Sequence, residues 1–365
     1  MMMIYEKVST IEFEVTTTCN SFCPVCIRFH EEVEKDGIMK HDGGLWLNPL
    51  VDFNQHLSVE HLTKILSDPY VADNVSLDFI GTAGDPIAHP NFLEILEVAK
   101  KLKPKASFNI HTNGGLRNPD YYKELAETLS DVRALFRFSI DGLEDTNHIY
   151  RIGVQWSRVM DNLRAFIKAG GEPTWQMVIF PWNIHQVNEV EKIAKEIGCV
   201  GFDTRQNVMG ADGLDQLMEK SKTNFYKTES LPQEYQVPSS TFDKDLEIII
   251  NKYEYIDDAC VSKEGIFVRP EGYIFPCCMF SSSAYNFNQR ELLKEAYFDP
   301  YEKGWNEIEK HSLSKIMNHQ WWTDLKTGLD NNKPCDLCIQ QCGATREERS
   351  YHDIDENFTE FTNEK

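Results

Sequence analysis

The alternation of short apolar strands with amphipathic helices is the feature that most restricts the fold of this chain. Strands are expected at residues 8–17, 75–80, 106–111, 135–140, 175–180 and from 201 onward. Helices are expected between them, at residues 58–67, 91–103, 121–129, 157–169 and 188–197. Strand and helix thus alternate about six times with short turns, which is typical of a parallel sheet with right-handed crossovers. This favours an α/β fold, a partial (β/α)6 TIM-like barrel rather than a doubly wound sheet, with active residues at the carboxyl ends of the strands.

Three cysteines follow the first expected strand. Cys19, Cys23 and Cys26 are spaced C-x3-C-x2-C. Thiolates are soft ligands suited to iron–sulfur clusters, and a fully ligated four-iron cluster normally takes four of them. Three local thiolates would therefore leave one iron without a side chain. An open metal position is where chemistry takes place, as in catalytic zinc sites.

A disulfide and a structural zinc ion are the alternatives for these cysteines. The chain starts Met-Met-Met-Ile-Tyr-Glu-Lys without an apolar signal segment. We therefore expect a cytoplasmic protein with reduced thiols, which disfavours a disulfide. Zinc would need a fourth ligand, and His30 lies four residues after Cys26.

Composition and charge exclude two classes of partner. The chain has 365 residues, of which 41% are hydrophobic and 26% charged, as is ordinary for a soluble protein with a sizeable core. The net charge of −21 disfavours duplex nucleic acid as a partner. No stretch approaches the roughly 18 uninterrupted apolar residues of a membrane span, so no membrane partner is expected.

Polar turns follow the next three expected strands. They are Gly-Thr-Ala-Gly-Asp-Pro at residues 81–86, Thr-Asn-Gly at 112–114 and Ser-Ile-Asp-Gly-Leu at 139–143. Glycines permit a ligand to approach the backbone closely, although a tight turn between strand and helix explains the first segment equally well. Arg151 lies ten residues after Asp141, and a guanidinium is suited to bidentate pairing with a carboxylate. The alternative is that Arg151 forms a surface salt bridge, which would contribute little to stability.

The cysteine spacing after a first strand, together with these turns, resembles the radical S-adenosylmethionine (SAM) superfamily. The resemblance implies that the open iron of a [4Fe-4S] cluster chelates the methionine end of SAM, and that reductive cleavage yields a 5′-deoxyadenosyl radical. A low-potential donor such as flavodoxin or ferredoxin would reduce the cluster. Val25 stands where many relatives carry an aromatic residue against adenine.

The same resemblance assigns the SAM-binding residues. The segment with Gly84, Asp85 and Pro86 looks like the family's Gly-Gly-Glu segment, whose backbone holds the amino group of SAM, with Asp85 in place of the Glu. Asn113 belongs to a recurrent family turn. Ser139 and Asp141 match a segment that approaches the SAM ribose and neighbouring groups, and Arg151 matches a basic residue that pairs with the SAM carboxylate. The residues implied are Gly84, Asp85, Pro86, Asn113, Ser139, Asp141 and Arg151.

A second group of cysteines lies in the C-terminal part. Residues 266–275 are expected to form a hairpin with Pro-Glu-Gly at its turn. One cysteine precedes this hairpin, one follows it, and a C-x2-C pair comes later in the chain. This order of cysteines resembles that of the twitch domain, a shortened relative of the SPASM domain. This implies an auxiliary [4Fe-4S] cluster held by Cys260, Cys277, Cys335 and Cys338. Cys278 or Cys342 could replace one of these ligands, and zinc is the alternative metal.

The expected organisation has four parts. They are a radical SAM barrel at residues 8–210, an acidic linker with a helix at 211–255, a twitch domain at 256–345 and a mobile acidic tail at 346–365. A polar insertion at residues 29–56 has the length of a functional loop and could cover the barrel mouth.

The function expected is that of a radical SAM oxidoreductase or maturase. The substrate radical would pass an electron to the auxiliary cluster, and the substrate would be a small molecule or a peptide. The alternatives are a peptide-modifying maturase of natural-product precursors, or a non-catalytic iron–sulfur or zinc protein. Arg205 could face the barrel interior, whereas Glu12 and Glu14 are expected as buried partners of a basic residue and not as catalytic bases.

Overall fold

The computed structural model describes residues 6–24, 26–30, 46–48, 50–206, 255–256, 264–286, 289–331, 333–344 and 357–361. One nine-stranded sheet organises most of them. Its strands are β1 (Val8–Phe13), β4 (Val71–Phe79), β5 (Ser107–Thr112), β6 (Arg133–Ser139), β7 (Pro173–Ile179), β8 (Gly201–Gln206), β10 (Gly265–Val268), β11 (Ile274–Phe275) and β13 (Asn357–Glu360). Their order is β11-β10-β1-β4-β5-β6-β7-β8-β13.

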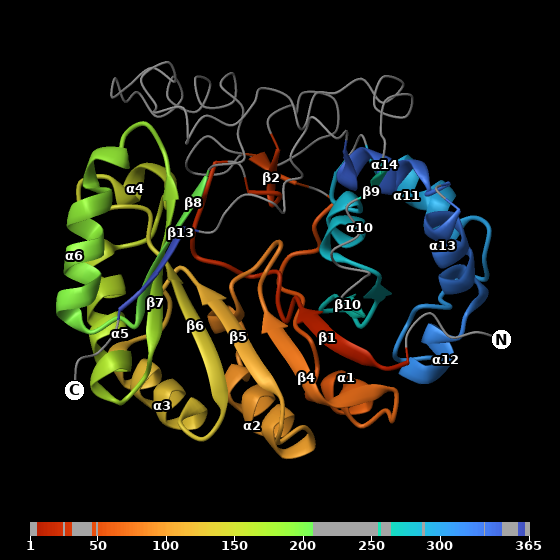
Figure 1. Ribbon diagram of the computed structural model, residues 1–365, viewed down its shortest axis with the longest axis horizontal. Coiled ribbons are helices and arrows are strands. Elements are labelled where there is room, and N and C mark those ends of the chain that lie inside the picture. Colours follow the sequence, from red (N-terminus) through yellow and green to blue (C-terminus); the bar gives the residue numbers. More distant parts are fainter. Residues whose placement is uncertain are drawn as a thin grey trace.

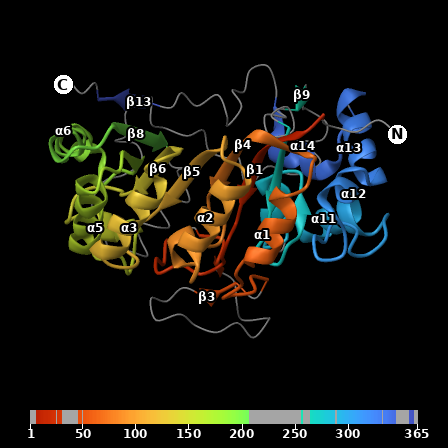
Figure 2. The same ribbon diagram turned by 90° about the horizontal axis from the view of Figure 1, so that it is seen from below.

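The predicted α/β partial barrel is confirmed. From β1 to β8 every neighbouring pair is parallel. The crossover helices lie on the outer face of the curved sheet (Figures 1 and 2). They are α1 (Val59–Leu66), α2 (Phe92–Leu102), α3 (Pro119–Leu129), α5 (Trp156–Lys168) and α6 (Val187–Ile197), with the short α4 (Asn147–Tyr150), η1 (Pro86–Ala88) and η2 (Ile184–Gln186) in the connections.

Local sequence explains where these elements begin and what they bury. At the predicted cap of α1, the Ser58 hydroxyl accepts a hydrogen bond from the His61 N–H at 3.0 Å, which satisfies an orphan donor of the first turn. The core between sheet and helices is rich in phenylalanine. The rings of Phe13 and Phe79 stack at 5.6 Å and those of Phe79 and Phe108 at 6.3 Å, so neighbouring strands are joined on their helix-facing side.

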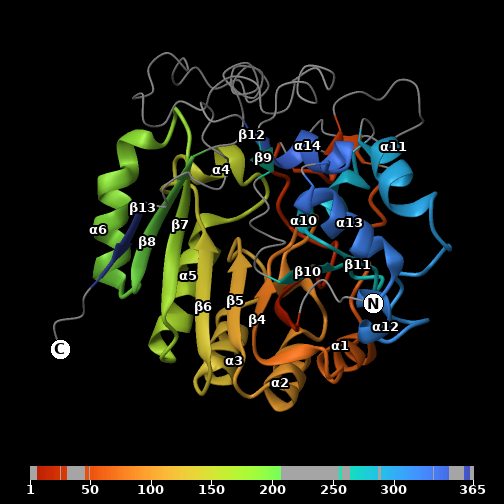
Figure 3. The same ribbon diagram turned by 45° about the vertical axis from the view of Figure 1, so that its right-hand side comes forward.

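The C-terminal part adds to the barrel sheet instead of standing beside it. The predicted hairpin is confirmed as the antiparallel pair β10–β11. However, β10 also pairs in parallel with β1, with Ile266 opposite Ile11. The helices that follow pack next to this edge (Figure 3). They are α10 (Cys278–Ser283), α11 (Arg290–Leu293), η5 (Lys294–Phe298), α12 (Leu313–Met317), α13 (Gln320–Asp330) and α14 (Asp336–Cys342).

The part of the acidic tail that the structure describes adds a strand to the sheet. Strand β13 pairs antiparallel with β8, with Phe358 opposite Asp203. The Phe361 N–H then donates to the Val200 carbonyl at 3.0 Å. Without β13, the backbone N–H and C=O groups along the outer edge of β8 would have no strand to pair with. The tail pairs with these groups despite its acidic composition.

Several expectations fall outside the described residues. These include most of the insertion, of which only the short antiparallel pair β2 (Phe29–His30) and β3 (Trp46–Leu47) and residues 48 and 50–56 are described. Residues 207–254 also lie outside. The helix expected up to residue 255 is wrong at its last position, because β9 (Tyr255–Ile256) pairs with β12 (Gly343–Ala344). Within the described part of the chain, no helix is long and apolar enough to cross a membrane.

Candidate active site

The loop after β1 carries the first three cysteines and is tied to the barrel by its backbone. The Phe22 N–H donates to the Ile152 carbonyl at 2.8 Å, and the Cys26 N–H to the Cys23 carbonyl at 3.0 Å. Gly153 lies against this loop, where an added Cβ would come within 2.9 Å of the Phe22 ring. The loop is therefore fixed by close packing and by hydrogen bonds at the carboxyl end of the sheet.

Polar groups surround the sulfurs of the loop. Ser21 donates through its N–H to Cys19 Sγ at 3.4 Å, and its hydroxyl lies 3.0 Å from Cys23 Sγ. Asn113, from the turn after β5, donates to Cys19 Sγ at 3.4 Å. N–H donors around sulfur stabilise negative charge on it, as they do around cysteine-held clusters.

Arg28 is a residue of this site that the sequence reasoning missed. Its side chain is buried and folds back over the loop, with Nε 3.4 Å from Cys26 Sγ. Its Nη1 donates to the Cys19 carbonyl at 3.2 Å and its Nη2 to the Ser21 carbonyl. Its position two residues after the last cysteine was the only available signal, because nothing in the spacing indicates that the chain reverses there.

The electrostatics of the loop suit a bound cationic group. Burial raises the pKa of Cys19 to about 12, with Asp85 adding to the rise and Arg28 opposing it. Burial also raises the pKa of Cys23, against a lowering by Arg151. Thiolates in this place need positive charge next to them, and iron in a cluster provides it.

Within the described residues, no three His, Cys, Asp or Glu side chains converge on one point as the ligands of one ion do. A four-iron cluster takes its thiolates at separate corners.

The turn after β4 locks onto the cysteine loop. An added Cβ at Gly84 would lie 1.9 Å from the Thr16 carbonyl oxygen, and one at Gly81 would lie 1.7 Å from the Gly84 carbonyl oxygen. The Asp85 N–H donates to the Thr18 carbonyl at 2.9 Å. The tight packing of the turn against the loop therefore accounts for both glycines.

Asp85 is a buried link between neighbouring strand ends. Its carboxylate accepts hydrogen bonds from Thr112 Oγ1 at 3.0 Å, from the Asn113 N–H at 2.8 Å and from the Ile87 N–H at 3.0 Å. Through the bond from Ile87, the Asp85 side chain caps η1, and Pro86 is the first residue of that helix. Burial raises the pKa of Asp85, and these donors oppose the rise. Asp85 thus joins the turn after β4 to Asn113 and, through it, to Cys19.

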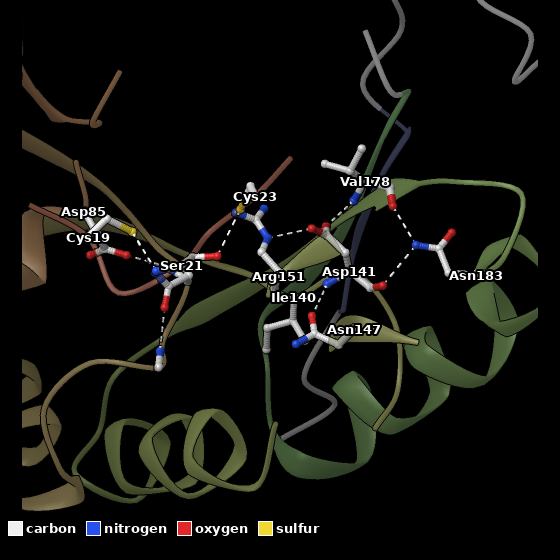
Figure 4. Close-up of polar contacts among 12 residues, drawn as sticks. Cys19, Ser21, Cys23, Asp85, Ile140, Asp141, Asn147, Arg151, Val178 and Asn183 are labelled. Carbon is white, nitrogen blue, oxygen red and sulfur yellow. Dashed lines mark hydrogen bonds and ion pairs between the residues drawn. The ribbon is translucent and has the colours of Figure 1, made fainter. Parts of the chain in front are cut away.

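Asp141 and Arg151 form a buried ion pair beside the loop (Figure 4). Arg151 Nε lies 2.6 Å from Asp141 Oδ2, while Asp141 Oδ1 accepts from the Val178 N–H at 2.8 Å. Arg151 Nη1 then lies 3.8 Å from Cys23 Sγ. Both carboxylate oxygens of Asp141 are occupied by protein donors, so this residue aims Arg151 at the cysteine loop. Ser139 lies at the end of β6, in register with Gln176.

The second cysteine group comes together at the carboxyl-terminal helices. Cys335 donates to Cys338 at 3.4 Å, and Cys338 and Cys342 lie four residues apart, on one face of α14. The pKa of Cys338 is raised first by its hydrogen bond with Cys335, then by burial and by the charges of Cys335, Cys277 and Cys342. Cys277 is the N-cap residue of α10 and belongs to this group because its charge acts on Cys338, whereas Cys260 lies outside the described residues.

A buried network lies between the two cysteine regions. Glu14 is fully buried, and its Oε1 accepts the Ala83 N–H in the turn after β4. Its Oε2 lies 3.5 Å from the Tyr285 hydroxyl, to which Arg269 at the end of β10 donates. Burial raises the pKa of Glu14 to about 7, and the charge of Arg269 opposes the rise. Glu14 thus has a buried basic neighbour, as the sequence analysis expected.

Comparisons with known proteins agree with this arrangement. A cofactor-modifying protein of a tungsten-containing aldehyde ferredoxin oxidoreductase, from Pyrococcus furiosus, is 30% identical over 140 residues, which is 38% of this chain and 33% of the relative. The match thus spans about a third of that curated relative.

Two solved proteins share the fold over most of the chain. The structure of anSMEcpe with bound AdoMet has a TM-score of 0.53 at 18% identity and covers 94% of this chain and 88% of its own. SuiB of Streptococcus suis, solved with S-adenosylmethionine, has a TM-score of 0.51 at 15% identity and covers 93% and 71%. The family model described as "Radical SAM superfamily" matches residues 13–197, about half of the chain. This protein therefore belongs to the radical SAM superfamily.

Proposed function

We propose that this protein reductively cleaves SAM and uses the resulting radical to take a hydrogen atom from a carbon of its substrate. The observation that carries the proposal is the buried loop in which Cys19, Cys23 and Cys26 lie at the carboxyl end of a radical SAM barrel, with Arg28 and Arg151 beside their sulfurs. Bound there, a [4Fe-4S] cluster with one open iron would supply the electron and the coordination site for SAM.

Arg151 would bind the carboxylate of SAM. Its guanidinium is fixed by Asp141 through Nε, and its Nη1 is directed at Cys23. This leaves its remaining N–H groups as donors for a carboxylate next to the open iron. Asp141 is then a positioning residue, because its own oxygens are engaged with Arg151 and Val178.

The turns after β4 and β5 would complete the SAM site through their backbone. Asp85 ties the segment of Gly84 and Pro86 to Asn113, and Asn113 contacts the sulfur of Cys19. We assign the segment at Gly84 to the amino group of SAM and Ser139 to its ribose, as the family resemblance implies, and the hydrogen bond from the Asp85 N–H to the Thr18 carbonyl places the first segment against the cysteine loop.

The second cysteine group would hold an auxiliary [4Fe-4S] cluster that takes an electron from the substrate radical. Support comes from the grouping of Cys277, Cys335, Cys338 and Cys342. With Cys260 as a further candidate, the group offers the four thiolates of a fully ligated cluster, which transfers electrons and binds no substrate. The Cys342 position on α14 favours it as a replacement for one of the four ligands that the resemblance implies.

Iron and 5′-deoxyadenosine measurements test the proposal. After anaerobic reconstitution and reduction with dithionite or a flavodoxin or ferredoxin system, the protein should form 5′-deoxyadenosine from SAM. The Cys19→Ala/Cys23→Ala/Cys26→Ala protein should lose roughly four irons and all of this activity. Cys199→Ala is the matched control, because Cys199 is a buried core residue away from both groups. Undiminished SAM cleavage in the triple variant would contradict the proposal, and a wild-type protein that binds iron without cleaving SAM would favour the non-catalytic alternative.

A peptide-modifying maturase is the second candidate. The observation in its favour is the fold shared with anSMEcpe, which has also been solved with bound AdoMet and the Kp18Cys peptide at a TM-score of 0.51 and 17% identity, covering 93% of this chain and 91% of its own. Deuterium transfer into 5′-deoxyadenosine from a labelled peptide, but not from labelled small molecules, would favour it.

A further inference from the structure

The turn after β7 packs against the ion pair of Asp141 and Arg151. It runs from Phe180 to Gln186 and ends in the short helix η2. Strand β7 pairs in parallel with β6, so this turn lies beside the turn that carries Asp141. Two sets of contacts join the turn to the pair, one polar and one aromatic.

Asn183 makes the polar contacts. Its side chain is fully buried, and its Nδ2 donates to the Asp141 carbonyl at 3.0 Å and to the Val178 carbonyl at 2.8 Å. Its Oδ1 accepts the Phe180 N–H at 2.7 Å. A side-chain amide has two hydrogens and one oxygen, and Asn183 uses all three to join backbone groups of two neighbouring strand ends (Figure 4).

These contacts fix both the backbone and the side chain of Asp141. The Val178 residue that Asn183 holds through its carbonyl donates its own N–H to Asp141 Oδ1 at 2.8 Å. The Asp141 N–H donates to Asn147 Oδ1 at 2.8 Å. The carbonyl, the N–H and one carboxylate oxygen of Asp141 are thus all engaged. The remaining oxygen, Oδ2, is thereby held toward Arg151 Nε, which lies 2.6 Å away.

The aromatic contacts restrain the same guanidinium. The buried rings of Phe180 and Trp182 stack with their centroids 4.6 Å apart. The Phe180 ring lies 4.6 Å from the Tyr150 ring, and Arg151 Cζ lies 5.4 Å over the Tyr150 ring. A guanidinium at this distance is attracted by the face of an aromatic ring. Rotation of the Arg151 side chain would therefore cost both the ion pair and this contact.

Such restraint favours ligand binding. A mobile arginine loses rotamer freedom when a ligand orders it, and that loss reduces the affinity. The Arg151 side chain is only 17% exposed and is already tied to Asp141. The ordering has therefore taken place on folding, and a carboxylate that approaches Arg151 meets a guanidinium already in position.

Resting on the proposed function, we propose that Asn183 is a positioning residue for SAM. By clamping Asp141 to the end of β7, Asn183 orients Arg151 for the SAM carboxylate. It acts through Asp141 and does not itself bind SAM, because its Nδ2 and Oδ1 are engaged by the backbone. Its loss should lower the affinity for SAM while leaving the iron content of the protein unchanged.

Equilibrium binding of SAM to the reconstituted full-length protein tests this role. Asn183→Ala should weaken binding about fivefold or more, as expected when a hydrogen bond that orders a charged group is lost. Asn306→Ala is the matched control, because Asn306 is equally buried and donates through Nδ2 to the Ile274 carbonyl in the C-terminal part. The control should bind SAM within twofold of wild type. Equal weakening in both variants would overturn the proposal.

A double-mutant cycle separates positioning of Arg151 from general support of the fold. In Arg151→Ala protein, the added change Asn183→Ala should alter the affinity for SAM by less than twofold, because the group that Asn183 orients is already gone. Changes that act through one contact are not additive, whereas independent ones are. A loss of the same size in both backgrounds would overturn the proposal.

Hydrogen exchange in the wild type, read by mass spectrometry, covers the case in which Asn183→Ala fails to fold. Bound SAM should slow exchange at the Val178 and Phe180 amides, because a ligand on Arg151 stabilises the contacts around Asp141. Unchanged exchange at both amides in protein that binds SAM would overturn the role of Asn183 alone. A wild type that binds no SAM would overturn the proposed function, and this role with it.

Discussion

The two cysteine regions differ in what balances the charge of their sulfurs. In the loop after β1, Arg28 lies beside Cys26 and Arg151 beside Cys23, so cations of the protein approach the thiolates. Among the described residues, the groups that set the pKa of Cys335 and Cys338 are other cysteines, backbone N–H groups and Asp336. The first region therefore combines thiolates that could hold a cluster with guanidinium groups that could bind a carboxylate, while the pKa of Cys338 in the second region is set chiefly by neighbouring cysteines and by burial. That difference is expected between a site that binds SAM and a cluster that passes electrons.

The largest expected effect separates the roles of the two regions. In Cys335→Ala/Cys338→Ala protein that retains its first cluster, 5′-deoxyadenosine should still form while oxidised product falls sharply, roughly a hundredfold or more if a low-potential electron acceptor is lost. The measurement is the ratio of product to 5′-deoxyadenosine with the true substrate, with Cys199→Ala as control. An unchanged ratio would make the second group merely structural.

Removing the cation next to Cys23 should weaken SAM binding. Arg151→Ala deletes a charge-assisted bond to the SAM carboxylate, at a cost of about 1.5–3 kcal/mol, or roughly 10- to 150-fold in affinity. Equilibrium binding of SAM to the reconstituted protein measures it. Arg158→Ala, on the exposed side of α5, should bind like wild type. Affinity within twofold of wild type for Arg151→Ala would refute the assignment.

Removing the cation next to Cys26 should act on the first cluster alone. Arg28→Gln loses the positive charge and part of the bonding to the Cys19 and Ser21 carbonyls. We expect faster iron loss to a chelator, on the order of tenfold, with the second cluster unaffected. Iron release followed by absorbance checks this, and the exposed Arg164→Gln is the control. Equal loss from both clusters would show that Arg28 supports the fold and not the loop.

The smallest effect concerns Glu14, between the two regions. Its pKa is raised by burial from 4.5 to about 7, so between these values the folded chain holds a proton that the unfolded chain has released. The free energy of unfolding should therefore fall as the pH rises from about 4.5 to about 7, by at most on the order of 3 kcal/mol. Glu14→Gln should remove this fall. Denaturant unfolding at pH 5, 6, 7 and 8 measures it, and Glu127→Gln, an exposed carboxylate, should keep the wild-type slope.

Prediction from the sequence succeeded where the deciding interactions are local. Each crossover helix and each parallel strand from β1 to β8 was expected within a few residues, because hydrophobic period and caps act over one or two turns. The cysteine spacing likewise lies within eight residues of chain. The sequence could not reveal that the Arg28 side chain folds back onto Cys26, because this position depends on hydrogen bonds to the carbonyls of residues 19 and 21.

The roles of the acidic residues at the strand ends needed the structure. The resemblance implied that the backbone around Asp85 holds SAM and that the Asp141 carboxylate approaches it; the structure adds that both carboxylates are buried and accept hydrogen bonds from neighbouring strand ends. The sequence carries no signal for this, because the donors come from other repeats of the barrel. Asn113, in contrast, was expected at the site and does contact Cys19.

The sequence by itself determined the α/β repeat, the polar strand ends and the loop of three cysteines, because periodicity and spacing are properties of short segments. Only the tertiary structure decided that β10 lies beside β1 and that β13 closes onto β8. The physical reason is that the exposed edge of a sheet offers only backbone N–H and C=O groups, which are the same for every residue. Which distant segment pairs with that edge is settled by how the whole chain packs.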